Sequence, residues 1–223
     1  MSRTIKIVIG AVVGLAVLVS AGTFVFIHFI EGDAPKRLSL STTGTTAAPS
    51  NEPLDGTWRP TSASQVGYRV KEVLFGQDHD AVGRTNKVSG TMVMAGTTVT
   101  GVDLTVDMAS VTSDQSRRDN QFRGRIMDVS SFLTATFKLT KPIALASSAG
   151  TVTVPATGDL TLRGTTRSVT VDLHTRRNGS NIEVNGTIPI TFDEWGIPSP
   201  SFGPVTTQDH GELELLVVFA KAA

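Results

Sequence analysis

Apolar and polar side chains alternate along much of the chain after residue 64. Val66, Tyr68 and Val70 are each followed by a polar or small residue. The same alternation recurs in five further segments, at 102–108, 133–139, 169–173, 182–190 and 213–219. A period of two puts apolar side chains on one face of a β-strand and polar side chains on the other. The pattern therefore predicts antiparallel strands with one buried face and one solvated face.

Shorter strand-like runs lie at 88–94, 151–156 and 158–163. Turn-forming residues separate several of the strands, at Ala95-Gly96, 148–150 and Asn178-Gly179. About eight short strands in one domain indicate a β-sandwich or an up-and-down barrel. We predict an all-β, lipocalin-like antiparallel barrel with one short helix.

The apolar faces leave two interpretations open. Their side chains could pack against each other as a solid core, or an eight-stranded barrel could keep an interior wide enough for one small ligand. Small residues on the inward faces, Gly90, Ala135 and Gly186, favour spare volume. Alternation alone does not distinguish a cavity from a filled core.

The predicted helix covers residues 113–125. Ser113 is a favourable N-cap, Asp114 suits the first turn, and no β-branched residue follows in the segment. Phe122 and Ile126 are spaced four residues apart, which gives a small apolar stripe. A single helix among antiparallel strands is expected to pack across the sheet or to plug one end of a barrel.

Arg118 and Asp119 form the most notable polar pair in this segment. One hypothesis makes the pair a clamp for the polar head of a ligand at a cavity mouth. The other makes it a structural brace, because a guanidinium offers a forked set of donors to carboxylates and carbonyls. We favour the brace.

The segment from 7 to 30 is apolar apart from His28. Its length exceeds the roughly 20 residues that span a bilayer and the roughly 7–15 of a signal-peptide core. We predict an N-terminal transmembrane anchor within residues 1–30; a signal peptide cleaved near Ala21 is the alternative. Arg3 and Lys6 precede the span and Lys36 and Arg37 follow it, so the Lys/Arg bias that sets orientation is nearly balanced. We favour the orientation with the short N-terminus in the cytoplasm. The protein is thus expected in the cell membrane as a single-pass protein with its C-terminal domain extracytoplasmic.

Residues 31–53 are rich in Ser, Thr, Pro, Ala and Gly, a composition that predicts a linker. Residues 54–223 form the predicted barrel domain. The 20 basic residues equal the 20 acidic ones, whereas a nucleic-acid-binding domain normally carries a basic excess. The absence of cysteine excludes disulfides, thiolate nucleophiles and Cys-based metal sites.

No catalytic motif stands out. The chain contains neither a G-x-S-x-G nor an H-E-x-x-H sequence. Asp78-His79-Asp80 and Asp193-Glu194 are interpreted as loop or turn residues. We therefore predict a protein that is not an enzyme, with no cofactor, no metal site and no nucleic-acid partner.

Residues 116–139, SRRDNQFRGRIMDVSSFLTATFKL, carry the Arg-Asp pair in the predicted helix and run through Asp128-Val129 into a predicted strand. This stretch resembles a signature of the YceI-like family, which consists of an Arg-Asp pair, a short helix, an aromatic-Asp-Val turn and a strand ending in Thr-hydrophobic-Phe. Residues 158–173, GDLTLRGTTRSVTVDL, resemble a second signature of two strands around a Gly-x-Thr-Arg turn. The sequence departs from the family at Glu72 and Arg163, where the family often has histidine.

The resemblance implies a barrel that holds a polyisoprenoid or similar amphiphile without catalysis. The chain would then be a membrane-tethered lipid-binding module; the alternative is a structural or protein-interaction domain with a filled core. Within the 116–139 signature, Phe122 and Phe137 are favoured over the charged pair as ligand contacts. The full set of candidate ligand-binding residues is Tyr68, Val70, Leu104, Val106, Phe122, Ala135, Phe137, Leu160, Val171 and Trp195.

Overall fold

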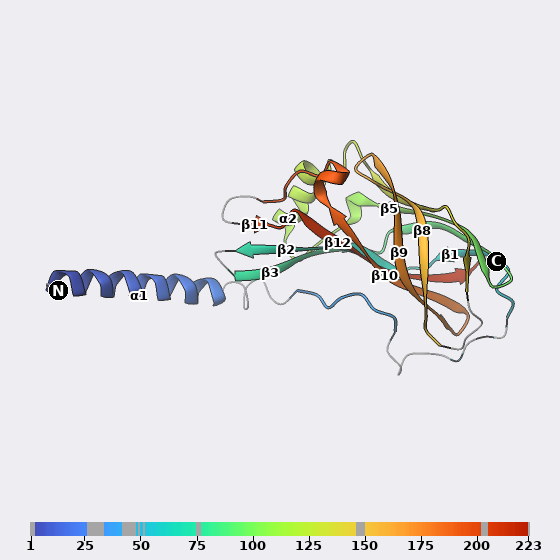
Figure 1. Ribbon diagram of the computed structural model, residues 1–223, viewed down its shortest axis with the longest axis horizontal. Helices are drawn as coiled ribbons and strands as arrows, with labels where there is room; N and C mark the ends of the chain where they lie inside the picture. Colours follow the sequence, from blue (N-terminus) through green and yellow to red (C-terminus); the bar gives the residue numbers. More distant parts are fainter. Residues whose placement is uncertain are drawn as a thin grey trace.

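The alternating segments form one antiparallel sheet that closes on itself (Figure 1). The computed structural model describes residues 3–25, 34–41, 48, 50, 52–74, 77–145, 150–201 and 205–222. Within these residues the strands are β1 (Gly56–Pro60), β2 (Gln65–Leu74), β3 (Gln77–Thr85), β4 (Val88–Ala95), β5 (Thr98–Asp107), β6 (Thr134–Leu139), β7 (Ile143–Ala144), β8 (Val152–Leu162), β9 (Thr165–Asn178), β10 (Asn181–Thr191), β11 (Val205–Thr207) and β12 (His210–Lys221).

The ring runs β1–β4–β5–β6–β8–β9–β10–β12 and closes because β12 pairs with β1. Along that same edge, β12 pairs first with β2 over 212–216 and then with β1 over 219–221. Thus β1 and β2 are halves of one bent strand, and so are β3 and β4, which pair with β2 and β1. The described residues therefore form an eight-stranded antiparallel barrel, and the predicted fold class is confirmed in this part.

Ser64 makes the bend between β1 and β2 possible. Its side chain is fully buried. The hydroxyl donates to the Val218 carbonyl at 3.3 Å and accepts the Val218 N–H at 3.0 Å. The Thr61 N–H donates to the same carbonyl at 2.8 Å. These bonds replace the pairing that the bend interrupts, because buried backbone groups need partners.

β1, which carries Trp58, lies at the end of the barrel opposite α2 (Figure 1). The Trp58 side chain is almost completely buried, and its indole N–H donates to the Leu54 carbonyl at 2.9 Å. The inward apolar side chains of the strands join it in one continuous core cluster. The predicted strand-like runs at 151–156 and 158–163 are one strand, β8, rather than two. At Gly158, in its middle, a Cβ would come within 2.4 Å of the Phe137 ring.

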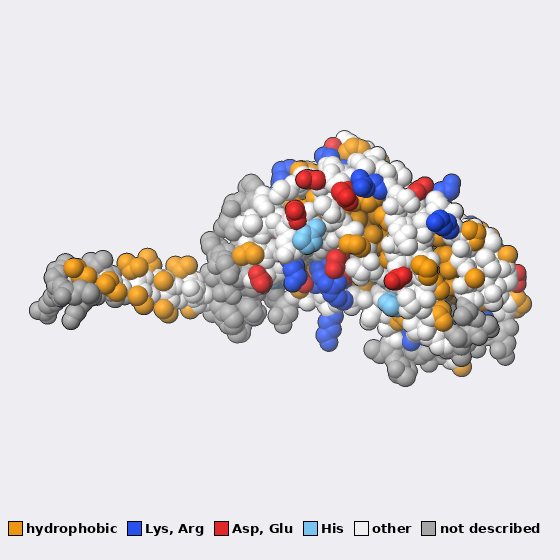
Figure 2. All heavy atoms as spheres, in the orientation of Figure 1, with side chains coloured by type: hydrophobic (Ala, Val, Ile, Leu, Met, Phe, Trp, Pro, Cys, Tyr) orange, Lys and Arg blue, Asp and Glu red, His pale blue; other side chains and the backbone are white. Residues whose placement is uncertain are grey.

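β9 and β10 pair only next to their turn, from Asn178–Asn181 to Leu173–Gly186. In a hairpin with a two-residue turn, the pair next to the turn, here Asn178 and Asn181, is hydrogen-bonded. Hydrogen-bonded positions alternate along an antiparallel strand, so every second residue of β10 after Asn181 directs its backbone nitrogen toward β9, and Pro189 is one of them. Proline has no N–H to donate, so the ladder cannot continue there. The two strands diverge beyond this point, and Figure 2 shows hydrophobic side chains at the surface between them.

The short helix η5 (Phe192–Trp195) lies at the top of this β9–β10 opening (Figure 1). Arg163, in the β8–β9 turn, donates to the Gly196 carbonyl at 2.6 Å. Arg167, on β9, donates to the Glu194 carbonyl at 3.3 Å. These two bonds join the β8–β9 hairpin to the η5 segment across the gap.

The predicted helix is present but begins later than expected. α2 (Ser116–Gln121) continues into a π-helical turn, η4 (Phe122–Ile126). The prediction of Ser113 as the N-cap was wrong: Gln115 occupies that position, and its side chain makes no capping hydrogen bond. The Ser113 hydroxyl and N–H instead donate to the Asp119 carboxylate at 2.7 and 2.8 Å. Ser113 therefore shapes the turn that precedes the helix.

α1 (Arg3–Val25) covers most of the predicted apolar span. Where its side chains are described, the large apolar ones are exposed, including Leu15 and Leu18. Judged over the described residues, none of the helices has the length and apolarity required to cross a membrane. The last part of the predicted span, 26–30, lies outside those residues.

Residues 34–41, which we call the outer strap, lie along the outside of the barrel although they belong to the predicted linker. Side chains on four strands donate to backbone carbonyls of the strap. The bonds are Arg69 to Pro35 at 2.6 Å, Arg84 to Lys36 at 2.5 Å, Asn185 to Leu38 at 3.0 Å and Arg176 to Ser41 at 2.8 Å. The strap is therefore held mainly through its main chain, and the predicted domain boundary at residue 54 stays a prediction.

Candidate ligand-binding cavity

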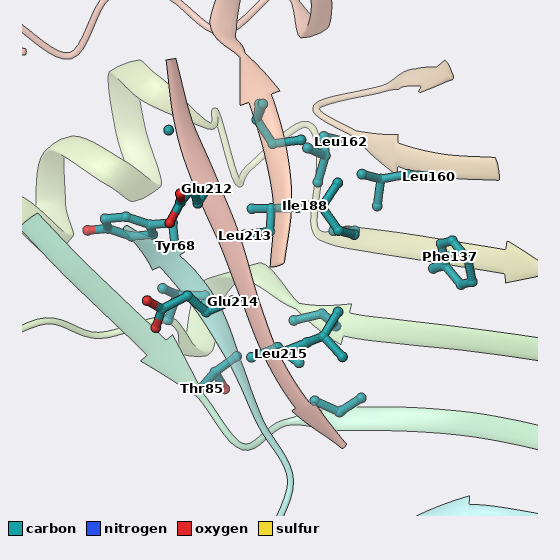
Figure 3. A pocket seen from close by; sticks show the side chains of 18 of the residues that line it. Tyr68, Thr85, Phe137, Leu160, Leu162, Ile188, Glu212, Leu213, Glu214 and Leu215 are labelled. Carbon is teal, nitrogen blue, oxygen red and sulfur yellow. The ribbon is translucent and has the colours of Figure 1, made fainter. Parts of the chain in front are cut away.

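The barrel encloses a cavity of about 540 Å³. This volume is within the roughly 300–1,000 Å³ of small-molecule sites. Its wall is mostly apolar and comes from the inward positions of the strands, with α2 and η4 at one end. Figure 3 shows Leu160, Leu162, Ile188 and Phe137 on the side of the pocket away from Tyr68. The apolar faces thus surround a space, and the filled-core interpretation does not describe this barrel.

Nine of the ten predicted ligand-binding residues line this cavity. They are Tyr68, Val70, Leu104, Val106, Phe122, Ala135, Phe137, Leu160 and Val171. Trp195 is the exception: it is buried in the core as part of η5, but it is not among the described lining residues. The alternation rule located the wall correctly, and contact of these residues with a ligand stays a prediction.

Polar side chains gather at the α2 end of the cavity. Glu72 reaches it from β2, and Gln115, Arg117, Arg118 and Gln121 reach it from α2 and the residue before it. Sequence reasoning did not select these residues for the site. The inward position of Glu72 was a usable signal, because it shares its strand parity with Val66, Val70 and the lining Tyr68.

Tyr68 forms the boundary between the apolar and polar parts. Its ring stacks on Phe122 with centroids 5.1 Å apart and an interplanar angle of 15°. On the other side, a Cβ at Gly83 would lie 2.4 Å from the Tyr68 ring, so only glycine leaves room there. Figure 3 shows the Tyr68 hydroxyl directed away from the leucine side chains of the pocket.

Burial, together with nearby carboxylates, keeps the Tyr68 hydroxyl protonated. Burial is the main cause that raises the pKa of this phenol, and the carboxylates of Asp119, Glu72 and Asp114 add to it. Arg118 acts in the opposite direction but does not compensate. A protonated phenol can both donate and accept a hydrogen bond.

Arg118 and Asp119 act as a brace, as the sequence favoured. Arg118 donates to Glu72 on β2 at 3.1 Å and pairs with Asp114 on its own segment. Asp119 accepts from the hydroxyl and N–H of Ser113. The pair therefore fastens α2 to the barrel wall and to the preceding turn.

Buried ion pairs on the outer wall stiffen the same strands. Glu214 on β12 accepts from Arg69 at 2.5 Å and from Arg84 at 2.7 Å, and Arg69 also pairs with Asp80 at 2.9 Å. Burial acts to raise the pKa of the Glu214 carboxyl, but the hydrogen bonds from Arg69 and Arg84 outweigh it and hold the pKa below its ordinary value. The strap covers this cluster through its bonds to the same two arginines.

Within the described part of the chain, no three His, Asp or Glu side chains are placed to hold a metal ion. The cavity wall accordingly offers hydrophobic contact along most of its length and hydrogen bonds at one end.

Comparison with known proteins identifies the family of this domain. The model of the family described as the YceI-like domain matches residues 59–219, which include every strand of the barrel except the first residues of β1 and the end of β12. The chain belongs to the YceI-like family. No curated protein sequence matches it.

Solved structures with the fold of this YceI-like domain include two bacterial proteins. One is a polyisoprenoid-binding domain from Saccharophagus degradans implicated in plant cell wall breakdown. It has a TM-score of 0.60 and 14% identity, over 74% of this chain and 98% of that one. The other is BcnA from Burkholderia cenocepacia, with a TM-score of 0.57 and 22% identity, over 71% of this chain and 98% of that one. At these identities the likeness concerns the fold of the YceI-like domain.

Proposed function

We propose that this protein is a membrane-tethered, non-catalytic module that holds an isoprenoid-like amphiphile inside its barrel. The observation that carries the proposal is the apolar cavity of about 540 Å³ in a domain of the YceI-like family. Each buried CH₂ of a ligand contributes about 0.8 kcal/mol, so an apolar chain needs no special chemistry to bind there. The polyisoprenoid-binding domain of similar fold supports the same ligand class.

Tethering to a membrane rests on the amino-acid sequence. The apolar run of residues 7–30 precedes the barrel, with Arg3 and Lys6 before it. The proposed orientation has the short N-terminus in the cytoplasm and the barrel outside it. In this position the barrel would be close to a store of lipid ligands.

Lipid binding is tested on the full-length chain purified from membranes in a mild detergent. Native mass spectrometry is expected to show an additional bound mass, and organic extraction should release an amphiphile with a long apolar chain. Preparations that are consistently free of bound mass would contradict the proposal. Replacing Leu160 by Arg is the matched variant, because a charge in the apolar wall should abolish the bound mass.

Tethering is tested separately by washing membranes with alkaline carbonate. The full-length chain should stay in the membrane pellet. A variant with Leu15 and Leu18 both replaced by Arg should appear in the supernatant, since each charge at a helix centre costs about 2.5–3.5 kcal/mol of insertion free energy. Release of the unmodified chain would refute the anchor and leave lipid binding unaffected.

A further inference from the structure

At the polar end of the cavity, the carboxylates of Glu72, Asp114 and Asp119 lie around one guanidinium. Arg118 is the largely buried guanidinium beside them, and both of its terminal nitrogens are engaged. Nη2 donates to Glu72 at 3.1 Å, and Nη1 pairs with Asp114. Glu72 and Arg118 expose only 10% and 15% of their side chains. The guanidinium is thus already neutralised by protein carboxylates.

A third carboxylate, Asp119, lies in the same region and is buried. Its hydrogen bonds come from the uncharged Ser113, so it adds negative charge without a paired cation in those bonds. The pKa of the Tyr68 phenol, which burial raises most, reflects the same excess of negative charge, since three carboxylates raise it further and one guanidinium lowers it. Arg117 also lines the cavity, on the exposed side of α2.

These carboxylates would repel an anionic head group. A phosphate placed beside Tyr68 would bring at least one negative charge close to Glu72, in a partly dry site where like charges repel more strongly than in water. It would also compete with Glu72 and Asp114 for a guanidinium that they already hold.

A neutral oxygen-bearing head group fits the same place. The Tyr68 hydroxyl makes no hydrogen bond with any residue that the structure describes, and it faces away from the leucine side of the cavity (Figure 3). It can donate to a hydroxyl or carbonyl oxygen of a ligand, and the Glu72 carboxylate can accept from a ligand hydroxyl. The amides of Gln115 and Gln121 add further uncharged donors and acceptors.

We propose that the cavity selects amphiphiles whose head is a neutral hydroxyl, phenol or carbonyl group and discriminates against phosphorylated ones. Glu72 is the residue that sets this preference, because it occupies Arg118 and supplies the repelling charge. The inference rests on the proposed lipid-binding function and specifies which chemical class of lipid is bound.

Tyr68 provides a selective probe, because it is the only tyrosine of the chain. The full-length protein is prepared with ring-labelled tyrosine in non-ionic detergent micelles, and the single tyrosine NMR signal is followed. The titrants are farnesol and farnesyl monophosphate, which share one apolar chain. Farnesol should shift the signal with a dissociation constant at least tenfold lower than that of farnesyl monophosphate.

The variant Glu72→Gln keeps an oxygen for Arg118 but removes the charge. This variant should bind farnesyl monophosphate at least fivefold more tightly than the unmodified protein does. The ratio of the two dissociation constants should therefore decrease. Asp103→Asn removes one charge from the exposed face of β5, far from the polar end, and should leave the ratio within twofold. Arg117→Gln should leave the dissociation constant of farnesyl monophosphate unchanged.

Three results would overturn the inference. Equal or tighter binding of farnesyl monophosphate would show that the polar end accepts anions. An unchanged ratio in a folded Glu72→Gln protein would remove Glu72 from the explanation; Asp114→Asn, which relieves the same guanidinium from the solvent side, provides the second variant if Glu72→Gln does not fold. A signal that neither ligand shifts would refute the proposed function itself, which is a distinct outcome.

Discussion

Replacing Ala135 by Phe distinguishes a cavity from a packed core. Ala135 is buried on β6 opposite Val106, and both side chains line the cavity. A phenyl ring in a packed core costs about 1–3 kcal/mol through overpacking. In an open cavity the same ring removes on the order of 100 Å² of apolar surface from water, which contributes about 2.5 kcal/mol. We therefore expect a free energy of unfolding equal to that of the unmodified protein or up to about 2 kcal/mol higher.

The measurement is urea unfolding followed by tryptophan fluorescence, because Trp58 and Trp195 are both buried and should report the loss of the barrel. The matched control is Gly158→Ala, whose new Cβ would lie 2.6 Å from the Lys138 carbonyl oxygen. One methyl group there should destabilise the protein by about 1–3 kcal/mol, while Ala135→Phe should not. Native mass spectrometry should show less bound lipid in Ala135→Phe. A loss of about 1 kcal/mol or more in that variant would refute the assignment of an open interior.

Three further predictions concern the stability of the barrel. Glu214→Ala leaves the buried Arg69 without its main partner and should cost about 3–5 kcal/mol in urea unfolding, whereas a change below 1 kcal/mol would mean that water solvates this site. The pKa values of the Glu214 and Glu183 carboxyls are lowered in the folded protein, so their contribution is complete above an unfolded-state pKa near 4.5 and is lost as the pH falls through the lower folded values. Unfolding measured from pH 6 to pH 2 should show this acid loss, and Glu183→Gln should make it shallower; an unchanged profile would contradict the assignment. Trp58→Ala removes a buried indole and its bond to Leu54 and should cost about 3–5 kcal/mol by calorimetry, and a cost near zero would contradict the contribution of this residue to the core cluster.

The barrel could be predicted from the sequence because its strands obey one local rule. Inward positions such as Val70 and Val171 are apolar and outward ones are mostly polar, so strand parity alone identified eight of the nine lining residues, and Phe122 came from the predicted helix. The strand boundaries were less predictable. Gly158 and Pro189 have the sequence signature of turns or breaks, yet both lie within strands, because Gly158 makes room for Phe137 and Pro189 faces an edge that has no partner.

The polar features depend on contacts between distant residues and were harder to predict. Arg69 and Glu214 are on the outward face of their strands, where parity predicts solvent, but they are buried against each other. Glu72 was noticed in the sequence only as a departure from the family pattern, and its pairing with Arg118 depends on where α2 is placed. The start of the helix was predicted too early, because Ser113 is as good a partner for Asp119 as it is a cap.

The outer strap sets how far the barrel can move from α1. With the strap detached, about 31 residues would join Val25 to the first strand, a contour of roughly 100 Å. Arg69 holds the chain at Pro35, which leaves about 10 residues and a reach of roughly 35 Å. Because arginines bind the strap by its carbonyls, most substitutions within the strap itself would preserve this short reach. Lengthening it would instead require changes on the strands, at Arg69 together with Arg84, Asn185 and Arg176, so residues of the barrel wall determine this distance.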